Sequence, residues 1–201
     1  MTPEQITKAS QDLFQAEKKR EQIKLLTSDY PDMKMDEAYA VQKALVGLKI
    51  ADGCKVTGWK IGLTSKAMQN ALNIDIPDSG ILFDDMHFKD KGVVPKGRFI
   101  QPRIEVEIAF VMKDGLDGAA SRQQVLSATS HVCPSIEILD TRILRADPET
   151  GKTRTVFDTI SDNAANAGIV LGVQNHDPSA IDLRWTGAIC SRNGEVEETG
   201  L

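Results

Sequence analysis

Residues 101–112, QPRIEVEIAFVM, place two glutamates inside a run that is otherwise almost entirely apolar. The run has the length of a β-strand, in which every second side chain points to the same face. Glu105 and Glu107 then share one face, with a separation of about 6.5 to 7 Å along the chain. Ala109 and Val111 continue that face and apolar residues fill the opposite one, so we expect both faces to be buried. Two buried carboxylates repel each other and need a positive charge nearby.

A third glutamate occupies a similar position in another apolar segment. Glu137 interrupts CPSIEILD, residues 133–140, on the face shared by Ser135 and Leu139. Carboxylate oxygens suit Mg²⁺ or Mn²⁺, and the three histidines of the chain show no spacing typical of a softer metal site. The residues by themselves leave two interpretations open. The glutamates either bind a divalent cation or lie on the solvated face of an edge strand with lysine or arginine partners.

The charge balance excludes a polyanionic partner. The 201 residues include 24 lysines and arginines, which are scattered, against 29 aspartates and glutamates, giving a formal net charge of -5. We therefore expect a small-molecule ligand and no nucleic acid. Cys54, Cys133 and Cys190 are far apart and form no CxxC pair, which predicts free thiols in a reducing compartment. Because no apolar run approaches membrane-spanning length, the sequence predicts a cytoplasmic protein with no membrane partner.

Hydrophobic periodicity divides the chain into an N-terminal helical segment, residues 1–52, and a β-rich body, residues 53–201. Thr2 and Pro3 predict the start of a helix, and a second helix is expected from Asp36 to about Ile50. The period then changes to that of strands. The predicted elements are a strand at 55–63, a short helix at 66–72 (KAMQNAL), strands at 103–112, 132–140, 168–172 and 183–190, and a tight hairpin at the Asn-Gly pair of RNGE, 192–195.

Five segments extend over essentially the whole chain in one order: GWKIGLTSKAMQ, IPDSGILFDDM, QPRIEVEIAFV, SIEILDTR and VFDTISDNAANAGIVLG. Together they resemble the hydratase and decarboxylase group of the fumarylacetoacetate hydrolase superfamily. The resemblance implies an α+β fold, in which a helical N-terminal segment precedes a mixed β-barrel or roll that is the metal-binding catalytic body. It also implies a metal-dependent hydratase of aromatic-compound degradation, which adds water to a seven-carbon 2-oxo-enoate diacid and forms a 4-hydroxy-2-oxo diacid.

The same resemblance assigns roles to particular residues. The resemblance implies that Glu105, Glu107 and Glu137 bind Mg²⁺ or Mn²⁺. Lys60 is implied to be an active-site lysine, and with Asp78 it is our candidate for moving protons. Ser161 is implied to bind substrate.

From the residues alone, these last three positions have simpler interpretations as well. Lys60 is also typical of a strand lysine in solvent or paired with an aspartate. Asp78, in IPDSG, is also typical of a tight turn, and Ser161 of a capped loop.

Two other functions remain open at this point. One is a 2-oxo-3-enedioate decarboxylase of the 4-oxalocrotonate type, and the other is a catalytically inactive, truncated partner subunit. The family pattern continues beyond the segment that matches RNGEVEETG, whereas this sequence ends at Leu201. We therefore expect a fold incomplete at its C-terminus, with exposed strand edges that favour homo-oligomers or poor solubility and with little hydratase activity.

Overall fold

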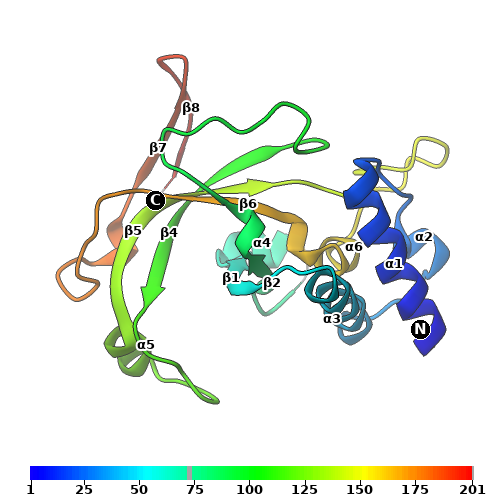
Figure 1. Cartoon of the computed structure of the whole chain (residues 1–201), viewed down its shortest axis with the longest axis horizontal. Coiled ribbons are helices and arrows are strands. Elements are labelled where there is room, and N and C mark those ends of the chain that lie inside the picture. Colours follow the sequence, from blue (N-terminus) through cyan, green and yellow to red (C-terminus); the bar gives the residue numbers. More distant parts are fainter. Residues whose placement is uncertain (72–73, 201) are drawn as a thin grey trace. The chain divides into compact units, whose positions relative to one another are not determined.

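The computed structural model describes residues 1–71 and 74–200. Its helices are α1 (Pro3–Lys19), α2 (Leu26–Asp29), α3 (Met35–Ala51), α4 (Lys66–Ala71), α5 (Arg122–Ala128) and α6 (Val156–Ser161), with short 3-10 helices η1 (Asp84–Met86), η2 (Asn163–Ala165) and η3 (Leu183–Trp185). Its strands are β1 (Val56–Gly62), β2 (Asp78–Phe83), β3 (His87–Phe88), β4 (Arg103–Met112), β5 (Thr129–Leu139), β6 (Asn166–Leu171), β7 (Ala188–Arg192) and β8 (Glu195–Gly200) (Figure 1).

The chain divides into two compact units. Unit one comprises Met1–His87, Val94–Arg103 and Ile138–Gly168, and unit two comprises Phe88–Val93, Ile104–Glu137 and Ile169–Leu201. Helices α1 to α4 and α6 therefore belong to unit one, and α5 belongs to unit two. These units group residues by contact, and the domain boundary expected at residue 52 stays a prediction.

The core of unit one is helical, and the predicted first helix is confirmed. The Thr2 hydroxyl accepts a hydrogen bond from the Gln5 backbone N–H, while the Gln5 side chain accepts one from the Thr2 N–H. This reciprocal cap fixes the start of α1. Leu13 of α1 is fully buried and packs in one cluster with Val41 and Leu45 of α3, the second predicted helix. Figure 1 shows the two helices side by side.

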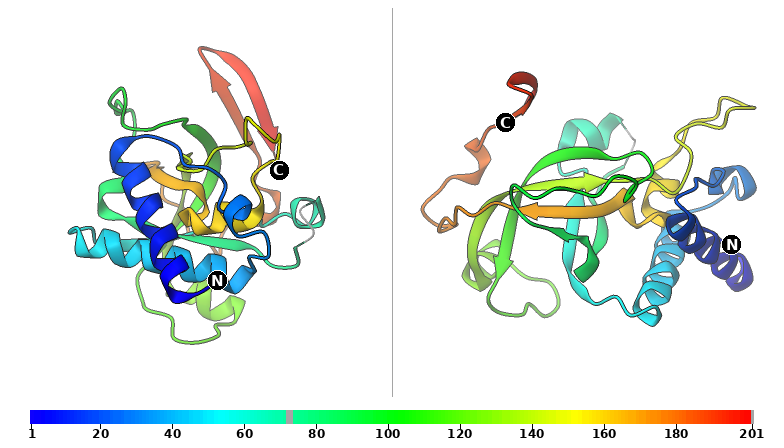
Figure 2. Two further views of the ribbon diagram at one scale, coloured as in Figure 1. Left: turned by 90° about the vertical axis from the view of Figure 1, so that its right-hand side faces the viewer. Right: turned by 45° about the horizontal axis from the view of Figure 1, so that its top comes forward.

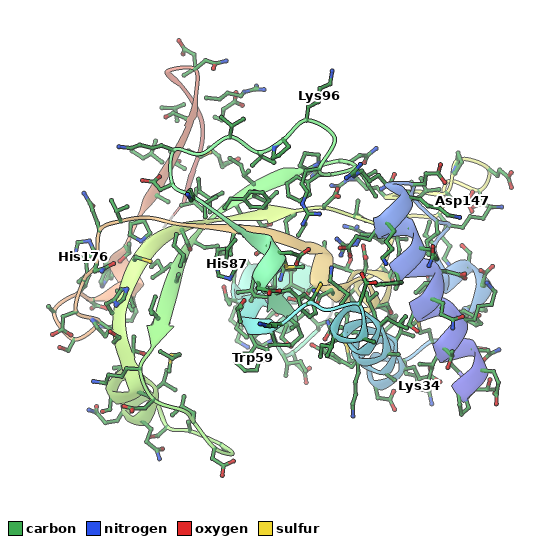
Figure 3. The ribbon with its side chains drawn as sticks, viewed as in Figure 1. Lys34, Trp59, His87, Lys96, Asp147 and His176 are labelled. Atoms are coloured by element: carbon green, nitrogen blue, oxygen red, sulfur yellow. The ribbon has the colours of Figure 1, made fainter. Side chains whose placement is uncertain are left out.

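Strand β1 pairs antiparallel with β2 in unit one and confirms the strand predicted at 55–63. Its two faces differ. Trp59, labelled in Figure 3, and Ile61 are 67% and 53% exposed, whereas Lys60 on the other face is half-buried. The short helix expected after this strand is α4, and Leu72, at the end of that predicted helix, lies outside the described residues.

A four-stranded sheet has the order β3-β6-β5-β4, which makes β4 an edge strand among the described residues. Strands β4, β5 and β6 confirm the predictions at 103–112, 132–140 and 168–172. The expectation that both faces of β4 are buried is wrong. Ile104 and Phe110 are 55% and 42% exposed, and Glu105 is exposed as well. The physical reason is that burial of a strand face depends on what packs over the sheet, and the described residues leave these side chains uncovered.

The β7-β8 hairpin of unit two forms as predicted at the Asn-Gly pair (Figure 2). Asn193 and Gly194 have φ angles of 55° and 90°, as a two-residue turn with positive φ requires. The strand expected at 183–190 begins only at Ala188. Before it lies η3, because the Asp182 carboxylate accepts hydrogen bonds from the backbone and side chain of Arg184 and so favours a tight turn.

None of the described helices combines the length and the apolar character that a bilayer span requires. Cys54, Cys133 and Cys190 are free thiols, as the sequence predicts.

Candidate functional site

Two neighbouring strands of unit two carry a cluster of glutamates. Glu105 and Glu107 lie on β4, and Glu137 lies on β5, the strand next to it in the sheet. Each residue offers one carboxylate oxygen, and the three oxygens lie within 4.8 Å of one another. Residues two apart on one strand point to the same side of a sheet, and so does the residue that faces them on the next strand. This explains why the three carboxylates converge. The structure thus brings together the three glutamates that the sequence singles out.

The burial of the cluster is graded. Glu137 is only 5% exposed, Glu107 is half-buried and Glu105 is exposed, so the cluster has a closed end and an open end. Carboxylates this close together repel each other unless a cation lies between them. Mg²⁺ and similar hard cations prefer such oxygens and complete their coordination with water or substrate oxygens. The residues therefore fit a divalent cation, with the open end facing incoming ligands.

A second cluster of possible ligands, Cys54 with Asp84 and Asp85, is a poorer fit. Asp84 already accepts a hydrogen bond from the Lys55 backbone N–H, and Asp85 accepts one from Arg98. Burial and the nearby carboxylate of Asp85 raise the pKa of the Cys54 thiol. Because a metal binds the thiolate, this environment disfavours coordination.

In unit one, β1 and β2 bring Lys60 and Asp78 together. Lys60 lies opposite Gly80 in the ladder, and Asp78 lies opposite Gly62. Lys60 and Gly62 are two residues apart on β1, so they share one face, as do Asp78 and Gly80 on β2. The ammonium and the carboxylate therefore meet diagonally across the face that the two glycines leave open.

Asp78 is buried in this arrangement. It is 4% exposed, and its Oδ1 atom lacks a hydrogen-bond partner among the described residues. Burial raises the pKa of the Asp78 carboxyl, while the positive charge of Lys60 and a hydrogen bond from the Gly62 backbone act in the opposite direction. The result is a carboxyl group that takes up a proton more readily than an exposed aspartate, next to an amine.

Ser161 lies at the end of α6, also in unit one. Its side chain is fully buried, and its hydroxyl donates a hydrogen bond of 2.8 Å to the Phe157 carbonyl oxygen one turn earlier. The donor is thus used within the helix, whereas the hydroxyl oxygen can still accept a hydrogen bond.

No family model matches the chain. Curated proteins do match it. The 2-oxo-hept-4-ene-1,7-dioate hydratase of Escherichia coli is 52% identical over 196 residues, which are 97% of this chain and 73% of the bacterial protein. The chain belongs to the hydratase and decarboxylase group of the fumarylacetoacetate hydrolase superfamily. The 2-keto-4-pentenoate hydratase of Paraburkholderia xenovorans (strain LB400), 40% identical, matches 100% of this chain and 72% of its own length.

Solved structures agree with membership of this hydratase and decarboxylase group. The 4-oxalocrotonate decarboxylase from Pseudomonas putida G7, in complex with magnesium and adipate, superimposes with a TM-score of 0.89 at 32% identity. The same enzyme in complex with calcium and acetate gives a TM-score of 0.88. Each match covers 100% of this chain and 74% of the solved chain.

Sequence reasoning found Ser161 but missed three other uncharged residues of the site. Asn163 accepts a hydrogen bond from the Ile81 N–H (2.8 Å) and donates one to the Ile81 carbonyl (2.9 Å), so it attaches η2 to β2. Its φ of 53° is left-handed, a conformation that asparagine tolerates better than most residues, and the two asparagines of DNAANAG were the available signal. Gly62 and Gly80 were also overlooked, although glycine inside a strand often marks a close approach of other groups.

Proposed function

We propose that this protein is a divalent-metal-dependent hydratase that converts 2-oxohept-4-ene-1,7-dioate into a 4-hydroxy-2-oxo diacid during the degradation of aromatic compounds. The observation that carries the proposal is the 52% identity to the E. coli hydratase over 97% of the chain. A 4-oxalocrotonate decarboxylase from Pseudomonas sp. (strain CF600) is 38% identical over 100% of the chain. The higher identity to the hydratase favours hydration over decarboxylation.

Glu105, Glu107 and Glu137 would hold Mg²⁺ or Mn²⁺, because their oxygens converge within 4.8 Å. When bound, the cation supplies a Lewis acid that draws electron density from the C1 carboxylate and the C2 oxygen of the substrate. The exposed Glu105 leaves the open end of the cluster accessible to those oxygens, whereas the buried Glu137 anchors the closed end.

Lys60 and Asp78 would move the protons of the reaction. A proton leaves C3 and another is added at C5, which brings the double bond into conjugation with the 2-oxo group. Water then adds its hydroxyl at C4 and a proton at C3. Burial raises the pKa of the Asp78 carboxyl, which lies beside the Lys60 amine. This pair suits such exchanges because each group can hold the proton that the other releases.

Ser161 would bind the substrate by turning its hydroxyl from the Phe157 carbonyl to donate to a substrate oxygen, because a 2-oxo dicarboxylate offers acceptors only. The small-molecule diacid would be the main partner, and we propose a homo-oligomer. Apolar residues of β4 support this: Ile104, Val106, Phe110 and Met112 are between 42% and 55% exposed on an edge strand. The three free thiols support a location in the cytoplasm.

Mass analysis of the product tests this function directly. The purified chain is incubated with 2-oxohept-4-ene-1,7-dioate and Mg²⁺, and a parallel sample contains a chelator. We expect a product heavier than the substrate by one water, formed only when the metal is present. A second assay supplies 4-oxalocrotonate, and loss of CO₂ from it, without hydration of the seven-carbon diacid, would make the protein a decarboxylase and overturn the proposal.

A further inference from the structure

The Lys60–Asp78 pair lies on a strand face whose two facing positions are glycines. A side chain at position 62 would occupy the space that the charged groups fill. A Cβ atom built there would lie 2.3 Å from Asp78 Oδ1 and 2.9 Å from Lys60 Nζ. Both distances are far below van der Waals contact, so no other amino acid fits without moving one of these groups.

Space, and not backbone freedom, is the reason for glycine at position 62. Its φ angle lies outside the left-handed region, so any residue could adopt its backbone conformation. The backbone of Gly62 also lies close enough to the Asp78 carboxyl to lower its pKa. A glycine here lets the main chain and the carboxylate come this close.

Gly80 has a matching role on the other strand. A Cβ atom at this position would lie 2.6 Å from the Asn163 carbonyl oxygen and 3.2 Å from Lys60 Cγ. The first contact is with the main chain of Asn163, whose side-chain amide makes two hydrogen bonds to Ile81, so it cannot easily give way. Gly80 therefore lets η2 pack against β2 and, at the same time, leaves room for the Lys60 stem.

Gly58, on the same face of β1, provides the contrast. A Cβ atom there would meet Leu82 Cδ1 at 3.5 Å, an ordinary contact. Not every glycine of the strand is thus required by packing. The tight positions are those that face the charged pair.

We infer that Gly62 and Gly80 are positioning residues, which hold the Lys60 amine and the Asp78 carboxylate in the geometry that proton transfer needs. The catalytic part of this inference rests on the proposed function, whereas the positioning itself does not. In Gly62→Ala, the new methyl group displaces Asp78 Oδ1, the nearer of the two atoms, and separates the carboxylate from the backbone of residue 62 and from Lys60. Both of these groups lower the pKa of Asp78, so its pKa should rise in the variant while the side chain stays buried.

The test compares Gly62→Ala with Gly58→Ala, the same substitution on the same face. Carbon-13 NMR titration of the carboxyl groups should show a higher pKa for Asp78 in Gly62→Ala and no change in Gly58→Ala. With the diacid and Mg²⁺, kcat should fall by about 10²-fold in Gly62→Ala, the range of a lost general acid or base, while KM and Mg²⁺ binding stay near wild type. Gly58→Ala should keep its kcat.

A double variant keeps the inference falsifiable if Gly62→Ala folds poorly. Asp78→Ala removes the carboxylate that the new methyl would meet, so Gly62→Ala/Asp78→Ala should melt at a higher temperature than Gly62→Ala. An unchanged Asp78 pKa in folded Gly62→Ala, or an absence of rescue in the double variant, would overturn the positioning role. An inactive wild type with the expected Asp78 pKa shift would refute the proposed function but not the positioning.

Discussion

The salt bridge between Arg142 and Asp162 should be the electrostatic interaction whose loss unit one tolerates least. Arg142 is 3% exposed and Asp162 is fully buried. The guanidinium donates to Asp162 Oδ1 at 2.5 Å, to the Asp162 carbonyl at 2.6 Å and to the Asn166 carbonyl at 3.2 Å. It therefore ties the segment around η2, which carries Asn163, to the end of β5.

The expected loss of stability follows from what Arg142→Met leaves behind. The Asp162 carboxylate would remain buried without its cation, and two carbonyl groups would lose donors. Breaking a buried pair in this way costs about 3 to 5 kcal/mol. Because Asp162 would still accept the Arg142 backbone N–H at 2.8 Å, we expect a loss near the lower end, about 3 kcal/mol in the free energy of unfolding.

Urea denaturation of wild type and variants measures this loss. Arg184→Met is the matched control, since it breaks an arginine–aspartate pair of similar length, 2.7 Å, that is solvent-exposed, and it should change stability little or not at all. The double variant Arg142→Met/Asp162→Asn also removes the stranded charge and should lose less than the two single variants together. A loss in Arg142→Met no larger than that in Arg184→Met would refute the reasoning.

Three further predictions concern the site. Lys60→Ala should lower turnover by about 10²-fold or more while calorimetry shows Mg²⁺ binding nearly intact, and wild-type rates would remove Lys60 from the mechanism. Asp78→Asn removes a group whose pKa burial raises above 3.8, so the folded wild type binds this proton more readily than the unfolded chain does. The free energy of unfolding of the wild type, relative to that of Asp78→Asn, should therefore fall as pH rises above 3.8. A difference between the two proteins that does not change with pH would contradict this. Ser161→Ala should raise KM for the diacid in steady-state kinetics, and an unchanged KM would argue against substrate contact.

The elements that the sequence predicts well are those with local causes. The cap at Thr2 and the alternation before Gly62 depend on neighbouring residues only, so pattern reasoning finds them. The glutamate cluster was also predictable in part. Alternation puts Glu105 and Glu107 on one face, but only the pairing of β4 with β5 brings Glu137 beside them.

The features that escaped prediction depend on partners distant in the chain. The exposure of Ile104 depends on what packs over the face of β4, which no local pattern reveals. The diagonal meeting of Lys60 and Asp78 depends on the register of β1 with β2, and hence on which residues lie opposite the glycines. The start of β7 was missed because the Asp182 side chain, and not apolar alternation, decides the conformation of the residues before it.

The central claim is that three glutamates from two strands form the metal site. Removing one of them, as in Glu137→Gln, should weaken Mg²⁺ affinity because a ligand is lost. It should affect stability far less, because the remaining two carboxylates repel each other less than three do. Glu195→Gln, an exposed glutamate of β8, is the control and should bind Mg²⁺ as wild type does.

Anomalous diffraction from a crystal soaked in Mn²⁺ tests the claim most directly. The account predicts one strong peak at direct coordination distance from Glu105, Glu107 and Glu137. A peak at Cys54, Asp84 and Asp85 instead, or three glutamate side chains apart from one another in solvent with no peak between them, would contradict it.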